Sequence, residues 1–117
     1  MATSLAIAFV AVLHLLFMVL EMFFWTRPLG RRIFGLSDEL AGKTAALAAN
    51  QGLYNGFLAA GLIWGLLSAQ QTAAISIFFL SCVIVAGVFG AITAKRIILY
   101  IQALPGAIAL AMVLLSG

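Results

Sequence analysis

The stretch that decides the fold is ATSLAIAFVAVLHLLFMVLEMFFW, residues 2–25. As a helix rising about 1.5 Å per residue, it is long enough to cross the roughly 30 Å hydrocarbon core of a bilayer. A cleaved secretory signal would have a basic start and a shorter apolar core, but the first Lys or Arg here is Arg27. The stretch therefore predicts a transmembrane helix, interrupted by two ionisable side chains, His14 and Glu21.

The rest of the chain has the same apolar character. Of its 117 residues, 66% are hydrophobic and 8% are charged, with a net charge of +3, whereas a soluble domain is about one quarter charged. Such a chain cannot give every helix a polar face, so we expect an integral membrane protein with a single domain over residues 1–117. The basic residues flank apolar runs, which favours membrane lipid over nucleic acid as their partner. The single Cys82 allows no intrachain disulfide.

Three more apolar stretches follow the first. The four predicted helices cover residues 2–25, 44–68, 73–94 and 97–115. Because the connections are short, we expect an all-α, four-helix antiparallel bundle. Ser37 is a suitable N-cap, so the second helix should begin near Asp38, ahead of its membrane segment. Pro105 followed by Gly106 predicts a kink in the last helix.

The distribution of basic residues predicts the orientation of the bundle. All six Lys and Arg lie in or beside the first and third connections. The positive-inside rule then places these two connections in the cytoplasm and both termini on the non-cytoplasmic side.

Polar side chains interrupt the predicted spans on the cytoplasmic side. From the rise of a helix, Glu21 lies about 6 Å, Asn50 about 10 Å and Gln102 about 9 Å inside the boundary. An unpaired amide in hydrocarbon costs several kcal/mol, and a carboxylate costs more. We therefore expect these groups to turn inward and form a polar pocket in the cytoplasmic half of the bilayer. The candidate ligand-binding or proton-relay residues are Glu21, His14, Asn50, Gln51, Tyr54, Asn55 and Gln102.

Several of these residues carry a family resemblance. The relevant features are Glu21 followed by Trp25, the run NQGLYNGFLA at 50–59, the run CVIVAG at 82–87, and Gln102 with Pro105. Together they resemble a family of small bacterial four-helix integral membrane proteins known as a domain of unknown function, with NQGxYN as the most specific part. The resemblance covers nearly the whole chain and implies a four-helix integral membrane fold. We expect a multi-pass protein of the plasma (inner) membrane. The resemblance implies no activity, so no catalytic residue is assigned.

Other four-helix families fit less well. Small multidrug exporters resemble the chain in length, but their acidic residue lies nearer the middle of the first helix than Glu21 does. Quinone reductases of the vitamin K type need a Cys-x-x-Cys pair, which Cys82 alone cannot provide. Membrane glutathione-dependent enzymes use intramembrane arginines, whereas every Arg here lies in or beside a connection.

Three functions therefore stay open. In the first, the pocket binds a small amphiphile or lipid-like ligand, with Glu21 as charge partner. In the second, Glu21 and His14 relay protons in a small-molecule transporter. In the third, the polar cluster only fixes helix packing in a structural or assembly partner. We expect no cofactor and no metal, and leave open whether the protein is an enzyme and whether it forms a homo-oligomer.

Overall fold

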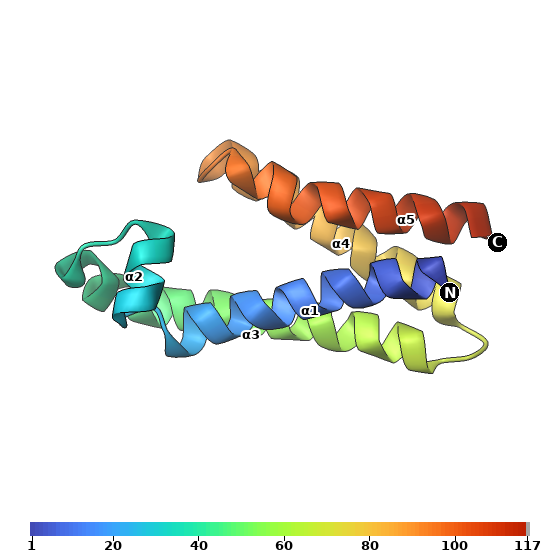
Figure 1. The fold of residues 1–117 in the computed structure, drawn as a ribbon, viewed down its shortest axis with the longest axis horizontal. Helices are drawn as coiled ribbons and strands as arrows, with labels where there is room; N and C mark the ends of the chain where they lie inside the picture. The colour runs from blue at the N-terminus through green and yellow to red at the C-terminus, as the bar shows by residue number, and fades with distance from the viewer. Residues whose placement is uncertain (117) are drawn as a thin grey trace. The chain divides into compact units, whose positions relative to one another are not determined.

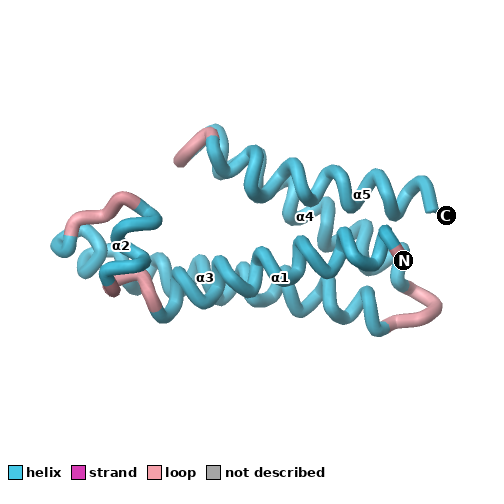
Figure 2. Tube along the Cα trace, viewed as in Figure 1, coloured by secondary structure: helices cyan, strands magenta, loops and turns pink. Residues whose placement is uncertain are grey.

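The structure is a computed structural model that describes residues 1–116. Its helices are α1 (Ala2–Phe23), α2 (Pro28–Phe34), α3 (Asp38–Leu67), α4 (Thr72–Thr93) and α5 (Leu104–Ser116), with a π-helical turn η1 (Leu99–Ala103) directly before α5 (Figure 1). Loops join the helices, and residues 1–116 contain no strand (Figure 2). The predicted all-α class is confirmed.

Three helical stretches are long and apolar enough to cross a membrane. They are α1, α4 and the continuous segment Leu99–Ser116 that η1 and α5 form together. The chain thus has the character of a membrane protein, as its composition predicts. The longest helix is α3, with 30 residues, but its amide side chains make it less apolar than the other three.

The chain divides into two compact units, of which the first contains residues 1–12 and the chain from residue 58 onward. Its core is formed by apolar side chains from α1, α3, α4 and α5. The largest of them are Ile7, Val10, Leu62, Leu80 and Val83, packed with Ala109 and Val113. The ends of α1 and α5 meet in this unit, where the hydroxyls of Thr3 and Ser116 lie 2.7 Å apart.

The predicted interruption of the last helix appears in the first unit as the π-helical turn η1. Pro105 has no backbone N–H, so it cannot close a regular helical bond to the residue four positions earlier. Just before it, the Leu104 N–H bonds to the Leu99 carbonyl, five residues back. A π-turn next to a proline is one way for a helix to absorb the missing bond.

The second unit contains residues 13–57, which include the end of α1, all of α2 and the first part of α3. The predicted start of α3 is confirmed: it begins at Asp38, and the Leu40 N–H bonds to Ser37 Oγ at 3.1 Å. The first helix ends at Phe23 rather than Trp25. The stretch between the first two predicted helices also contains a helix, α2, that the apolar pattern did not predict.

Candidate functional site

The second unit brings together two of the predicted polar residues, Glu21 of α1 and Asn55 of α3. Asn55 Nδ2 donates a hydrogen bond to Glu21 Oε1 at 2.5 Å. Asn55 is buried, with 7% of its surface exposed, and Glu21 is half-buried. The structure thus gives a carboxyl group on the candidate membrane span α1 a hydrogen-bonding partner from another helix.

Two glycines on α3 bring the helices close enough for this bond. A Cβ atom at Gly52 would lie 2.7 Å from Met22 Cγ and 3.1 Å from the Met18 carbonyl oxygen. One at Gly56 would lie 2.7 Å from Met18 Sδ. Gly52 and Gly56 are four residues apart, the spacing that lets helix backbones approach in lipid. Asn55 comes directly before Gly56, so the close helix contact positions its amide.

The pair keeps hydrogen-bonding capacity beyond the bond it forms. A carboxylate has about four acceptor positions, and an Asn side chain has two N–H donors and a carbonyl acceptor. The bond from Asn55 Nδ2 to Glu21 Oε1 uses one donor and one acceptor position. The site could therefore accept a hydrogen bond from a ligand's hydroxyl or amine group, and could also donate one from Asn55.

His14 lies on the same face of α1 as Glu21 but deeper along the helix. It is fully buried, and its ring meets the edge of Phe17 with centroids 5.4 Å apart. The sequence separation of seven positions from His14 to Glu21 corresponds to about 10 Å along the axis. A direct hydrogen bond between the two side chains would have to span that rise, so a bridging molecule would be needed to connect them.

The remaining candidates take no part in the hydrogen bond between Glu21 and Asn55. Asn50, Gln51 and Tyr54 are exposed on α3, and the Tyr54 ring contacts Phe57 with centroids 5.9 Å apart. At about 100° per residue, Asn50 is roughly 200° around the helix from Gly52, which packs on α1. Gln102 is half-buried in η1, within the first unit.

Sequence reasoning missed a second polar contact in the same unit. Trp25 Nε1 donates to Thr44 Oγ1 at 3.0 Å, and Thr44 Oγ1 donates to the Leu40 carbonyl at 2.7 Å. The Trp25 ring also packs on Phe34, with centroids 4.7 Å apart. Trp25 thus connects the end of α1 to both α2 and α3. An aromatic residue at the end of an apolar run indicated a boundary position, but not these partners.

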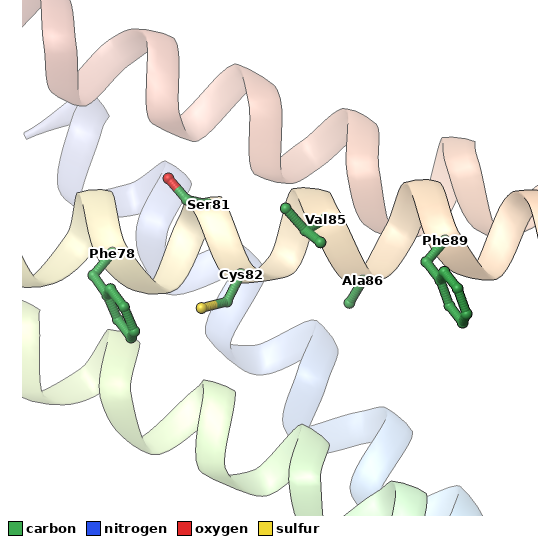
Figure 3. A pocket seen from close by; sticks show the side chains of 6 residues that line it. All are labelled: Phe78, Ser81, Cys82, Val85, Ala86 and Phe89. Carbon is green, nitrogen blue, oxygen red and sulfur yellow. The ribbon is translucent and has the colours of Figure 1, made fainter.

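Two shallow hollows lie in the first unit, and neither Glu21 nor Asn55 lines them. One follows the surface of α4 and is lined by Phe78, Ser81, Cys82, Val85, Ala86 and Phe89 (Figure 3). The other is lined by Ala6, Phe9, Leu104, Pro105 and Ile108. Both are almost wholly apolar, as expected of surfaces that face acyl chains. Residues 1–116 contain no group of three or more His, Cys, Asp or Glu that could hold a metal ion.

A family model described as "Protein of unknown function (DUF1304)" matches residues 8–114. The matched range includes Glu21, Asn55 and the glycines beside them. Comparison with curated proteins and with solved structures gives no match. The site must therefore be interpreted from its own chemistry.

Proposed function

We propose that this chain, which belongs to the DUF1304 family of proteins of unknown function, is a four-span membrane protein that binds a small amphiphile at the Glu21–Asn55 pair. The observation that carries the proposal is the hydrogen bond that Asn55 donates to Glu21, whose helix α1 is a candidate span. Ionisable groups within membrane segments are rare and mostly functional.

The contact between Thr3 and Ser116 supports four spans. Their hydroxyls are 2.7 Å apart, which supports placing the start of α1 and the end of α5 on the same side of the membrane. Three crossings would put the two ends on opposite sides, so the contact favours an even number. At 30 residues, α3 is about 45 Å long and can supply the fourth crossing.

The positions of the basic residues support the orientation. They are Arg27, Arg31, Arg32, Lys43, Lys95 and Arg96, which lie between α1 and the membrane segment of α3 or between α4 and η1. For a protein of the plasma membrane, the positive-inside rule assigns both regions to the cytoplasm. Glu21 lies two residues before the end of α1 at Phe23, so the site opens from the cytoplasmic half of the bilayer.

The chemistry of the site suggests the class of ligand. Glu21 accepts hydrogen bonds, and Asn55 can both donate and accept them, which suits a polar head with a hydroxyl or amine group. Met18 and Met22 border the same contact. Their flexible thioether side chains adapt to apolar groups of varied shape. A small amphiphile entering from the cytoplasmic leaflet has a polar head for Glu21 and Asn55 and an apolar part for the methionine side chains.

A structural role is the second candidate, because the same bond could simply hold two helices together. The close approach at Gly52 and Gly56 favours it, since packing of this kind stabilises membrane bundles without any ligand. In that case the pair would bind nothing, and its loss would cost stability alone. Proton-coupled transport, with His14 as a second relay group, would instead show as pH-driven flux in proteoliposomes that Glu21→Gln abolishes.

The test is native mass spectrometry of gently extracted protein, with thermal unfolding measured on the same samples. We expect wild type to retain a defined small molecule and Glu21→Gln to lose it while remaining folded. A wild-type protein that carries no such molecule, together with a Glu21→Gln variant that only unfolds at lower temperature, would exclude ligand binding and leave the structural role.

A further inference from the structure

The short helix α2 begins close to the membrane boundary. It starts at Pro28, and α1 ends at Phe23, so four residues join them. The five Cα–Cα steps from Phe23 to Pro28 reach at most about 18 Å. Because α1 is a candidate span, α2 starts within that distance of the end of a membrane helix. Figure 1 shows α2 beside the end of α1, within the second unit.

One side of α2 is fixed to its own unit. Gly30 is buried, and a Cβ atom there would overlap the Phe24 carbonyl oxygen, so the α2 backbone packs directly on the end of α1. Phe34 contacts the Trp25 ring on the same side. Gly35 ends the helix with φ of 66°, a left-handed conformation that glycine adopts without strain. These contacts define which residues α2 leaves outside.

The outer side of α2 carries an apolar pair. Leu29 is 49% exposed and Ile33 is 52% exposed. They are four residues apart and so lie on one face of the helix. Two large apolar side chains on a seven-residue helix are costly to hydrate, but they would be buried if that face lay at the boundary of the acyl chains.

The polar surface around α2 has an excess of positive charge. Arg31 Nη1 lies 3.9 Å from Asp38 Oδ1, and Lys43 Nζ lies 3.1 Å from Glu39 Oε1. These two ion pairs use both acidic residues of the stretch from 24 to 43. Arg27 and Arg32 are exposed and supply the remaining charge of +2, from four basic and two acidic residues.

We propose that α2 is an interfacial helix that binds anionic phospholipid. Leu29 and Ile33 enter the acyl boundary, and Arg27 and Arg32 bind the lipid phosphates of the same leaflet. The charge and the exposed apolar pair occur together on a helix attached directly to a span, which fits a lipid surface better than a soluble anion. The surface is separate from the Glu21–Asn55 pair, and the proposal does not depend on that site binding anything.

The first test compares lipid headgroups on detergent-purified protein by native mass spectrometry. We expect phosphatidylglycerol to bind more tightly than phosphatidylcholine. Arg27→Gln with Arg32→Gln should weaken phosphatidylglycerol binding about 30-fold, or roughly five-fold for each arginine, since each basic residue near a lipid surface contributes about 1 kcal/mol. Phosphatidylcholine binding should not change.

The matched control is Lys95→Gln with Arg96→Gln, which removes the same charge from the connection after α4. If both double variants lost the same affinity for phosphatidylglycerol, the effect would come from net charge alone, which would contradict a lipid site at α2. The proposal also fails if wild type shows no preference for phosphatidylglycerol, or if inorganic phosphate competes with it as an equal ligand at the same concentration.

A second test measures the depth of α2 without removing an arginine. Cys82→Ser leaves no cysteine, so Ile33→Cys can then be labelled with a fluorophore in liposomes. We expect a lipid-borne quencher placed near the headgroups to quench this label more strongly than a water-soluble quencher does. Glu39→Cys is the comparison, because that side chain is 79% exposed on the first turn of α3. Stronger water-soluble quenching at both positions would contradict an interfacial α2.

Discussion

Asn55 and Glu21 join α3 to α1 through a hydrogen bond of 2.5 Å. Asn50, five residues earlier on α3, is exposed and lies on a different face. The structure thus separates two asparagines of the same NQGLYN run (residues 50–55), one that meets a carboxyl group and one that does not. That difference makes Asn50 a matched control for predictions about Asn55.

A double-mutant cycle should detect the bond between Glu21 and Asn55. We expect Glu21→Ala and Asn55→Ala to be non-additive, with a coupling free energy of about 0.6 kcal/mol, the average for interhelical hydrogen bonds in membranes, and at most about 1.7 kcal/mol. The free energy of unfolding can be measured by titration from mild detergent into dodecyl sulfate. The same cycle with Asn50→Ala should show coupling near zero. Additive effects of Glu21→Ala and Asn55→Ala would mean that the side chains do not interact.

Gly52→Ala should destabilise the protein by about 1 to 3 kcal/mol, because the new methyl group would lie 2.7 Å from Met22 Cγ and 3.1 Å from the Met18 carbonyl oxygen. Gly42→Ala provides the control on the same helix, since nothing lies within 4 Å of a Cβ atom there. That change should stabilise α3 by up to about 1 kcal/mol through helix propensity. If the two substitutions had the same effect on thermal unfolding, α3 would not pack on α1 at Gly52.

Both termini should lie on the non-cytoplasmic side of the membrane. Reporter proteins that are active only outside or only inside the cytoplasm, fused to either end, would locate them. In a Cys82→Ser background, Thr3→Cys with Ser116→Cys should also form an intramolecular disulfide, because the native hydroxyls are 2.7 Å apart. Termini on opposite sides would mean three spans, with α3 outside the membrane.

Ser37→Ala should destabilise the protein by about 1 kcal/mol, because Ser37 Oγ accepts the Leu40 N–H at the start of α3. Ser37→Asp should retain most of the stability, since Asp is an equally good N-cap. Thermal unfolding of the two variants beside wild type is the measurement. Equal losses in both would show that the hydroxyl acts in some way other than as a cap.

The sequence predicted the elements whose signals are local. Long apolar runs indicated α1, α4 and the last helix, and Ser37 before two acidic residues indicated the start of α3. The helix α2 was missed because seven residues are too few for a clear apolar period. Pro28 at its first position and Gly35 at its end were the available signals, since this asymmetry is typical of helices.

The candidate site was harder to predict, because the depth of a residue in the membrane does not determine the direction in which its side chain points. Asn50, Tyr54 and Asn55 were all candidates for the predicted polar pocket, but only contact with α1 distinguishes them. The signal that could have chosen Asn55 is its position beside Gly56, one of two glycines at the spacing of close helix contacts. The sequence of α3 alone does not show which helix packs against these two glycines.

The most direct test of the Glu21–Asn55 site is the ligand occupancy of wild type, Asn55→Ala and Asn50→Ala, measured by native mass spectrometry under one extraction condition. If the pair binds an amphiphile, wild type and Asn50→Ala will carry the same small molecule, and Asn55→Ala will have lost most of it while remaining folded. Equal occupancy in all three proteins, or equal loss from both variants, would contradict a binding site at this pair.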